Sequence, residues 1–214
     1  IRRQRQMCIR DSVISPGVPI NHDIAVEFRA AGKRIVGELE FGFASKLPPI
    51  VAVTGTNGKT TTVSLIKAML DEEKIKSELV GNSGIPVSAR AEEIDENTVC
   101  VAEVSSFQLE SVSDFKPHIA CVLNITPDHL TRHYTMDNYI YLKRRILKNL
   151  KESEYAVLNY DDETVRSFSD ELRAETLWVS VKEKTNGAYA ENGKLCFGEE
   201  EIADISEMTV KGEH

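Results

Sequence analysis

The sequence contains no apolar run that approaches the roughly 18–20 residues of a membrane span. It also lacks a Cys-x-x-Cys pair, because its four cysteines lie far apart along the chain. Cys100 and Cys121 fall inside apolar, strand-like runs, which favours buried free thiols in a reducing compartment. We therefore expect a cytoplasmic protein with no membrane partner.

An excess of basic residues is missing as well. The 26 lysines and arginines are outnumbered by 34 aspartates and glutamates, and the formal net charge is −8. This balance argues against a nucleic-acid backbone or an anionic membrane as the main partner. With 41% hydrophobic residues in 214, the chain has enough apolar side chains to bury a core, which argues against wholesale disorder.

Residues 1–12 (IRRQRQMCIRDS) differ from the rest of the chain. They carry four arginines and show no helix or strand period. The segment begins basic but lacks the apolar core and the small-residue cleavage site of a signal peptide. We interpret it as a non-native segment, such as a cloning scar or a mistranslated end, with a basic binding arm as the alternative.

From Val13 onward, short apolar runs alternate with helical patterns, which predicts an α/β fold with a mostly parallel sheet flanked by helices. Around Asn192-Gly193 the pattern changes to strict alternation, which predicts a β-hairpin within a small β-rich C-terminal part. We expect helices at 23–31, 59–73, 137–150 and 163–172. We expect strands at 50–54, 78–80, 98–104, 119–125, 155–159, 177–181, 202–205 and 208–210.

A glycine-rich loop follows the apolar run at 50–54 and opens a helical pattern. Gly55 and Gly58 allow a close approach of bare backbone to a phosphate, which the N–H groups at the helix start would face. Lys59 can reach the terminal phosphates of a nucleotide, and the Thr60 hydroxyl can bind Mg²⁺. The standard P-loop needs glycine where this chain has Val53, and an ordinary glycine turn is the alternative.

The form TGTNGKTT at 54–61 is the one that ATP-dependent Mur ligases and folylpolyglutamate synthases carry in place of the standard loop. Further motifs follow in the expected order: GNSGIP at 81–86, EVSSFQLE at 103–110, NITPDHL at 124–130 and YIYLKRRI at 139–146. The chain thus resembles the Mur ligases from about residue 13 to its end. It is most similar to the branch that joins D-glutamate to UDP-N-acetylmuramoyl-L-alanine.

The resemblance implies three domains in a complete protein. Residues 13–47 look like the tail of an N-terminal, Rossmann-like UDP-binding domain, and residues 48–214 look like the central ATP-binding domain. The C-terminal amino-acid-binding domain is absent, and residues 212–214 resemble the start of a Gly-x-His-Asn segment that helps to hold adenine. We expect a fragment of a monomeric ligase.

ATP and two Mg²⁺ ions are the cofactors that the resemblance implies. The expected nucleotide-binding residues are Gly55, Thr56, Asn57, Gly58, Lys59, Thr60 and Thr61. The expected metal-binding residues are Thr60, Glu103, His129 and Lys143. Lys59, His129 and Lys143 are the expected catalytic residues.

Glu103 and His129 each follow a predicted strand, so both would reach the carboxyl edge of the sheet. A hard carboxylate oxygen suits Mg²⁺, whereas a surface or helix-capping carboxylate is the alternative for Glu103. The resemblance implies that His129 helps to hold the second Mg²⁺ and the substrate, although a lone histidine is usually structural. The family's acid at the second position after this histidine is Thr131 here, which weakens any role for an acid there.

Lys143 borders an apolar helical stripe that includes Tyr139 and Leu142. A lysine there would ordinarily extend its ammonium group out to water. The resemblance instead implies a lysine carbamylated by CO₂, which partial burial near cations would favour by lowering the pKa of the amine.

Four polar residues are expected to contact the nucleotide-sugar substrate, and ordinary polar roles remain the alternative for each of them. These residues are Ser15, Asn82, Ser105 and Gln108. For the Asp161-Asp162 pair we expect a helix-capping role.

The implied reaction phosphorylates the acceptor carboxylate with ATP, after which the amine of D-glutamate attacks the acyl phosphate. Two alternatives remain: another Mur ligase or a folylpolyglutamate synthase-like ligase, and a non-catalytic module that uses the phosphate loop as a switch.

The 214-residue chain alone should have no ligase activity and only weak affinity for ATP, because the expected adenine contacts and the amino-acid domain are missing. The check is an amide-formation assay on the purified chain with ATP, acceptor and D-glutamate. Measurable amide product would contradict this expectation.

Overall fold

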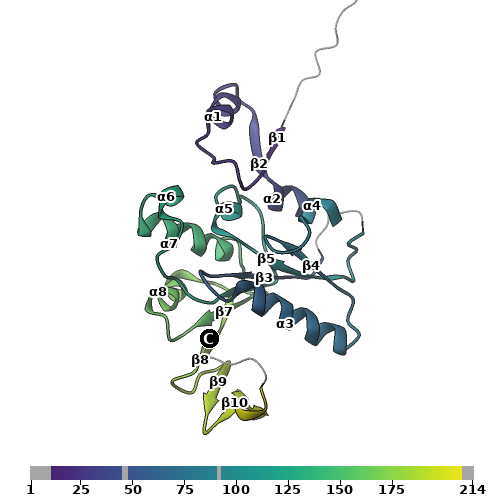
Figure 1. The fold of residues 1–214 in the computed structure, drawn as a ribbon, viewed down its shortest axis with the longest axis vertical. Coiled ribbons are helices and arrows are strands. Elements are labelled where there is room, and N and C mark those ends of the chain that lie inside the picture. The colour runs from purple at the N-terminus through teal and green to yellow at the C-terminus, as the bar shows by residue number, and fades with distance from the viewer. Residues whose placement is uncertain (1–10, 45–47, 91–92, 209–214) are drawn as a thin grey trace, which may run out of the picture.

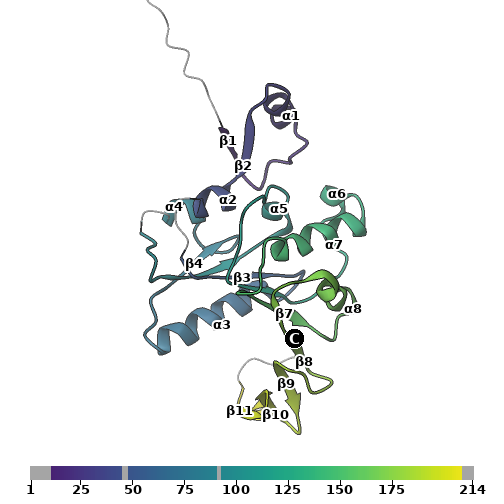
Figure 2. The same ribbon diagram turned by 180° about the vertical axis from the view of Figure 1, so that it is seen from behind.

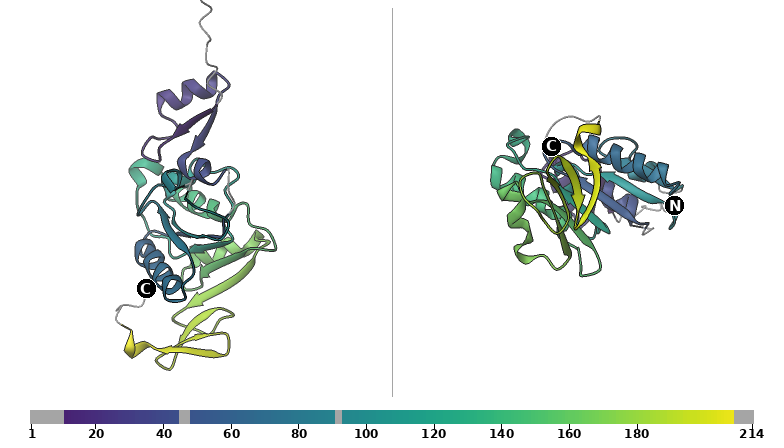
Figure 3. Two further views of the ribbon diagram at one scale, coloured as in Figure 1. Left: turned by 90° about the vertical axis from the view of Figure 1, so that its right-hand side faces the viewer. Right: turned by 90° about the horizontal axis from the view of Figure 1, so that it is seen from below.

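The computed structural model describes residues 11–44, 48–90 and 93–208. Its main sheet has nine strands in the order β11-β10-β9-β8-β7-β6-β3-β5-β4, and a separate parallel pair is formed by β1 and β2. The β1–β2 unit and the β9–β11 strands lie at opposite ends of the long axis (Figures 1 and 3). The predicted α/β class is confirmed.

The predicted strands between residues 50 and 205 are present, some with shifted ends, whereas β1 and β2 were not predicted as strands. The strands are β1 Asp11–Ile14, β2 Arg34–Gly37, β3 Ile50–Thr54, β4 Ser77–Gly81, β5 Val99–Glu103, β6 Ile119–Val122, β7 Tyr155–Asn159, β8 Glu175–Ser180, β9 Ala188–Glu191, β10 Lys194–Phe197 and β11 Glu200–Asp204.

The helices are shorter on average than predicted. They are α1 Asp23–Ala30, α2 Glu38–Phe43, α3 Lys59–Glu72, α4 Val87–Arg90, α5 Ser106–Leu109, α6 Leu130–His133, α7 Met136–Arg144 and α8 Glu163–Arg166, with 3₁₀ turns η1 Arg145–Leu147, η2 Ser167–Glu171 and η3 Ile205–Glu207. No helix of the described segments is long and apolar enough to cross a membrane.

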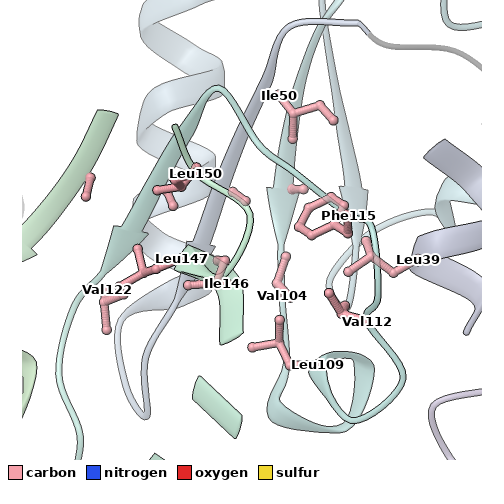
Figure 4. Close-up of a cluster of buried hydrophobic side chains, with 14 of the residues drawn as sticks. Leu39, Ile50, Val104, Leu109, Val112, Phe115, Val122, Ile146, Leu147 and Leu150 are labelled. Carbon is pink, nitrogen blue, oxygen red and sulfur yellow. The ribbon is translucent and has the colours of Figure 1, made fainter. Parts of the chain in front are cut away.

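Side chains of the central strands alternate between two cores. On one face, Val53 of β3 and Val101 of β5 pack with Val63 of α3. On the other face, Ala52 and Ala102 join a larger cluster. Figure 4 shows part of that cluster, in which Leu109, Ile146 and Leu150 approach the sheet from segments far apart in the sequence. The β3 strand is thus buried on both faces, as its continuous apolar run predicts.

The parallel pairing sets the geometry of the carboxyl edge. Strand β3 pairs in parallel with β5 on one side and with β6 on the other. Helix α3 covers one face, whereas α5 and α7 cover the other (Figures 1 and 2). Segments that follow β3, β5 and β6 therefore meet in one crevice, where ligands bind in open α/β sheets.

Two predicted helices end early. The predicted helix at 137–150 is α-helical only to Arg144 and then tightens into the 3₁₀ turn η1. The predicted helix at 163–172 is likewise α8 followed by η2. Short 3₁₀ turns are common at helix ends, and the apolar period that they continue does not reveal them.

The C-terminal hairpin is confirmed. Asn192 and Gly193 both have positive φ, of 50° and 79°, between the antiparallel strands β9 and β10. Two positive φ angles at these positions are typical of the turn type that Asn-Gly favours. The predicted strand at 202–205 is β11, and the predicted strand at 208–210 lies outside the described residues except for Met208, which is not in a strand.

The N-terminal boundary differs from the prediction by two residues. Asp11 and Ser12 were assigned to the non-native segment, but both belong to β1 and pair with Arg34 and Ile35 of β2. The backbone pairing is independent of the side-chain pattern on which the boundary was based. Residues 1–10, including Cys8, lie outside the described residues, and so do residues 212–214, so our interpretations of them stay predictions.

Three cysteines are free and buried in the described part of the chain: Cys100, Cys121 and Cys196. Burial raises the pKa of the Cys121 thiol to about 12. The prediction of buried free thiols is confirmed for Cys100 and Cys121, and Cys196, for which none was made, is buried as well.

The N-terminal unit (residues 11–44) is joined to the sheet domain through the carboxylate of Glu40 in α2. Glu40 is only 7% exposed. It accepts hydrogen bonds from the backbone N–H groups of Ser113, Asp114 and Phe115, at 3.0, 2.6 and 3.0 Å. Hydrogen bonds to a charged acceptor are roughly twice as strong as neutral ones. The Glu40 carboxylate thus fastens α2 to the loop that precedes β6.

Replacing Glu40 with alanine should lower the free energy of unfolding by about 2–4 kcal/mol, because three backbone N–H groups lose a largely buried charged acceptor. Urea-unfolding curves will measure the change. The matched control is Glu27→Ala, which removes an exposed carboxylate from α1. Equal stability of the two variants would contradict the role given to Glu40.

Candidate active site

The phosphate-loop motif lies between the carboxyl end of β3 and helix α3. Gly58 has φ 84° and caps the N-terminus of α3, and Gly55 has φ 152°. A Cβ atom on Gly55 would lie 3.0 Å from Cβ of Leu123, so the loop passes too close to the β6 exit for a side chain. Both glycines are needed by the backbone, and the N–H groups at the start of α3 form a potential anion site.

Asn124, directly beyond β6, holds the loop in shape. Its carbonyl oxygen accepts from Thr56 N at 2.9 Å. Its side chain accepts from Asn57 N at 2.8 Å and donates to Asn57 O at 3.1 Å. The sequence analysis placed Asn124 in a motif but gave it no role, because only the fold brings it to Asn57.

The hydroxyl of Thr56 ties the loop to two further segments. It donates to Thr126 O at 3.1 Å and lies 3.1 Å from the hydroxyl of Tyr139 on α7. Tyr139 is 1% exposed, and burial raises the pKa of its phenol. Sequence analysis assigned Tyr139 to the apolar stripe, which is correct for its ring but misses its hydroxyl.

Lys59 is the first residue of α3, and its ammonium group lies back over the loop. Nζ donates to Gly55 O at 3.0 Å and to Thr56 O at 2.8 Å. Both carbonyls belong to the phosphate loop, so the ammonium group lies beside the N-terminus of α3. A positive charge at this place suits the phosphates of a nucleotide.

Glu103 lies at the end of β5, next to the loop, and is only 2% exposed. Its carboxylate accepts from Thr60 Oγ1 and from Asn82 Nδ2, each at 2.7 Å. Gly81 allows β4 to lie close beside this residue, because a Cβ there would lie 2.3 Å from the main-chain oxygen of Glu103. The structure thus brings together three of the predicted site residues, and the alternative of a surface or helix-capping carboxylate for Glu103 is wrong.

Lys143 is 2% exposed, and its amine points to the phosphate loop. Nζ donates to Thr54 Oγ1 at 3.1 Å and to Gly55 O at 2.7 Å, so it shares the Gly55 carbonyl with Lys59. Burial, and then the positive charge of Lys59, lower the pKa of Lys143 to about 7. The alternative of a lysine that extends to water is therefore wrong.

Asp128 and His129 lie beyond β6, after the turn that contains Thr126, and both are partly exposed. The side chain of His129 is 50% exposed, and its Nε2 lies 3.4 Å from Asp128 Oδ2. His129 has φ 53° and caps α6. No group of three or more His, Cys, Asp or Glu side chains able to hold a metal ion is found within the described residues.

Ser105 and Gln108, two of the predicted substrate residues, form a capping box at the start of α5. Ser105 N donates to Gln108 Oε1 at 2.9 Å, and Gln108 N donates to Ser105 Oγ at 3.3 Å. Gln108 is 4% exposed. The pair thus has a structural role in the structure, and its substrate role stays a prediction. Ser15 is exposed in the turn after β1, and it makes none of the contacts described above for Lys59, Thr60 and Glu103.

The Asp161-Asp162 pair is split between two tasks. Asp162 caps α8 through Val165 N at 3.1 Å and also accepts from Ile125 N at 2.8 Å. Asp161 accepts instead from Ser180 Oγ at 2.7 Å and from Val181 N at 2.8 Å. The capping prediction is confirmed for Asp162 alone.

A groove of about 1270 Å³ lies elsewhere, between the N-terminal unit and the segment around η1. Arg34, Phe41, Tyr141 and Arg145 are among the residues that line it. Of its described lining residues, none belongs to the phosphate loop, so this groove is separate from the candidate site.

The family model described as "Mur ligase middle domain" matches residues 53–213, which include the phosphate loop, Glu103, His129 and Lys143. The chain belongs to the Mur ligase family. The predicted resemblance is confirmed.

Relatives share both sequence and fold with this Mur ligase chain. UDP-N-acetylmuramoylalanine–D-glutamate ligase of Thermoanaerobacter sp. (strain X514) is 44% identical over 207 residues, which cover 94% of this chain and 46% of the relative. The chain thus spans about half the length of the curated relatives it matches.

Two solved structures show the same fold. UDP-N-acetylmuramate:L-alanyl-gamma-D-glutamyl-meso-diaminopimelate ligase from Neisseria meningitides superposes with a TM-score of 0.63 at 14% identity, over 90% of this chain and 66% of that one. MurF ligase from Thermotoga maritima, solved in complex with ADP, gives a TM-score of 0.54 at 17% identity, over 87% of this chain and 52% of that one.

The buried amine of Lys143 should make stability depend on pH. Its pKa is about 7 in the folded chain and 10.5 in the unfolded chain, so between these values the unfolded state binds more protons. Stability should therefore rise with pH across this window and change little below pH 7 through this group.

Urea unfolding at several pH values will measure the effect as the difference between the wild type and Lys143→Met. As the pH rises from 7 to 10, the free energy of unfolding of the wild type should increase relative to that of Lys143→Met. A difference independent of pH would show that the amine is not depressed in the folded chain.

Proposed function

We propose that this chain is the ATP-binding part of a cytoplasmic ligase that joins D-glutamate to UDP-N-acetylmuramoyl-L-alanine in peptidoglycan precursor synthesis. The observation that carries the proposal is the cluster of Lys59, Thr60 and Glu103 at the end of β3 and β5. The 44% identical relative of that name supports the choice of acceptor and amino acid.

The proposal includes a division of the chain into domains. Residues 13–47 would be the end of a UDP-binding domain, extended by the two residues at the start of β1, and residues 48–214 would be the central ATP-binding domain. The separate β1–β2 sheet supports a boundary near residue 48. A further amino-acid-binding domain would complete the enzyme.

The physical problem of this reaction is to bring two anions together. The N–H groups at the start of α3 and the Lys59 ammonium would neutralise the γ-phosphate of ATP. A carboxylate oxygen of the acceptor would then displace ADP from that phosphorus, forming an acyl phosphate. Attack by the amine of D-glutamate would form the amide bond and release phosphate and a proton. Holding the reactants in line makes each reaction between two molecules effectively unimolecular, which lowers its entropic barrier.

The residues present fit one Mg²⁺ ion. Thr60 Oγ1 and Glu103 Oε2, 2.7 Å apart, are hard oxygen donors beside the loop, the donor type that Mg²⁺ prefers. When bound, the ion would stabilise negative charge on the transferring phosphoryl group. Glu103 needs no rearrangement of its strand for this task, because its carboxylate already faces Thr60.

A second Mg²⁺ would require a change at Lys143. An amine that donates two hydrogen bonds is not a metal ligand, whereas a carbamate offers two oxygens. The lowered pKa, about 7, supports carbamylation, because a neutral amine is the form that reacts with CO₂. We propose a carbamate at Lys143, with His129 as a further contact to the substrate or the ion.

The decisive test is the lysine of the loop in the complete ligase that contains this chain. Lys59→Ala should reduce turnover by about 100-fold or more, because the charge that neutralises the phosphates is lost. Release of ADP should require both the acceptor and D-glutamate, and this is the measured quantity. The matched control is Lys67→Ala, which removes a lysine of the same helix that pairs with Asp71.

Unchanged turnover in Lys59→Ala would overturn the proposed function. Release of ADP without acceptor or amino acid would instead identify the chain as part of a nucleotide-driven switch. A preference for a different amino acid would place it in another branch of the family.

A further inference from the structure

Arg132 on α6 forms a nearly buried ion pair with Glu110. Its Nε donates to Glu110 Oε1 at 2.9 Å, and its Nη2 donates to Glu110 Oε2 at 2.7 Å. The two side chains are only 16% and 7% exposed. A two-point pair of this kind fixes the direction of the guanidinium plane as well as its place.

The same guanidinium reaches the N-terminal unit. Nη1 donates to Gly17 O and Nη2 to Pro16 O, each at 3.3 Å. These carbonyls lie in the middle of a turn that is closed by Val18 N donating to Ser15 O at 3.0 Å. Two carbonyl dipoles of one turn therefore converge on one cation that belongs to the sheet domain.

Arg132 also orders the neighbourhood of His129. Its Cζ lies 4.8 Å from the centre of the Phe107 ring. Phe107 also contacts the His129 ring, at 4.9 Å between centres, and the His133 ring, at 5.4 Å. The half-exposed His129 thus gains a defined packing partner from the residue that Arg132 covers.

His133 completes this cluster behind Phe107. It is 1% exposed, its Nε2 lies 2.9 Å from Ser106 Oγ, and its Nδ1 lies 3.6 Å from Glu110 Oε1. Burial lowers the pKa of His133, and its Nδ1 makes no hydrogen bond within the described residues, so Arg132 is the cation that holds Glu110. The ion pair thus lies in a largely buried cluster rather than on the open surface.

We propose that Arg132 is a positioning residue that locks the turn at 15–18 onto α6 and thereby places the acceptor substrate relative to His129 and the phosphate loop. The placement of the acceptor rests on the proposed function, together with the expectation from the sequence that Ser15 of this turn contacts the nucleotide-sugar. The locking of the turn rests on the contacts of Arg132 alone.

Lysine cannot replace Arg132 in this arrangement. One ammonium group would have to serve two carboxylate oxygens and two carbonyl oxygens that the planar guanidinium reaches from three nitrogens. Arg132→Lys keeps the charge but should release the turn. Arg132 touches none of the phosphate-loop residues in these hydrogen bonds, so nucleotide binding should be spared.

The first experiment needs no substrate and uses the 214-residue chain. Arg132→Lys should speed amide hydrogen exchange at Val18 by about tenfold, because the turn opens more often once its carbonyls lose the guanidinium. Glu110→Gln should act in the same direction, since it weakens the pair that orients Arg132. Exchange at Val63, in the α3 core, should not change in either variant, which separates release of the turn from general destabilisation.

The control variant is Arg166→Ala. Arg166 also lies 4.8 Å over an aromatic ring, that of Tyr160, but on α8 and away from the turn. It should leave Val18 exchange unchanged. If Val18 exchange is unchanged in both Arg132→Lys and Glu110→Gln, the locking role is overturned.

The second experiment measures the kinetics of the complete ligase that contains this chain. Arg132→Lys should raise KM for the UDP-linked acceptor about tenfold and leave KM for ATP within about twofold. Arg166→Ala should leave both constants unchanged. An equal rise in both KM values, or no rise in either, would overturn the positioning role.

The two experiments separate this inference from the proposed function. If the complete protein does not ligate the acceptor at all, the proposed function fails and the positioning of the acceptor falls with it. Faster exchange at Val18 would then still establish the lock between the turn and α6.

Discussion

Hydrogen bonding on both sides of β3 is the constraint on which the candidate site depends. Val53 is opposite Glu103 of β5 on one side and Cys121 of β6 on the other. Because the three strands are parallel, their carboxyl ends deliver the phosphate loop, Glu103 and the segment around Asn124 to one place. A slip of one residue in the β3–β5 pairing would move Glu103 away from Thr60, and a slip in the β3–β6 pairing would move Asn124 away from the loop.

Electrostatic strain is concentrated at the same edge. Lys59 and Lys143 bring two amines to a single carbonyl, whereas Glu103 is held by neutral hydroxyl and amide donors. The loop therefore presents the Lys59 ammonium and the N–H groups at the start of α3, which suit a polyphosphate with several negative charges. Burial makes this arrangement costly without an anion and favourable with one.

Local signals in the sequence were sufficient for part of this picture. The glycine loop, its strand and its helix were predicted within one or two residues, because all three signals lie within a short stretch of chain. Asn124 and Tyr139 were missed as loop contacts, since each meets its partner across more than 60 residues of sequence. The contacts of Arg132 with Pro16 and Gly17 were missed for the same reason.

Short helices were the other weakness of the prediction. An apolar stripe continues through η1 as it does through α7, so periodicity does not show where an α-helix tightens. The capping box of Ser105 and Gln108 was visible in the sequence as a serine followed three residues later by a glutamine. It was interpreted as a pair of substrate contacts because the family resemblance suggested that role.

Lys59 and Lys143 both donate to the carbonyl oxygen of Gly55, so this oxygen keeps one donor if the other leaves. When an incoming anion draws the Lys59 ammonium away, the unmodified Lys143 amine still donates to that buried oxygen at 2.7 Å. Leaving such an oxygen without a partner would cost on the order of 1–3 kcal/mol. Because the Lys143 amine removes that cost, Lys59 can leave the Gly55 carbonyl and bind the incoming anion instead.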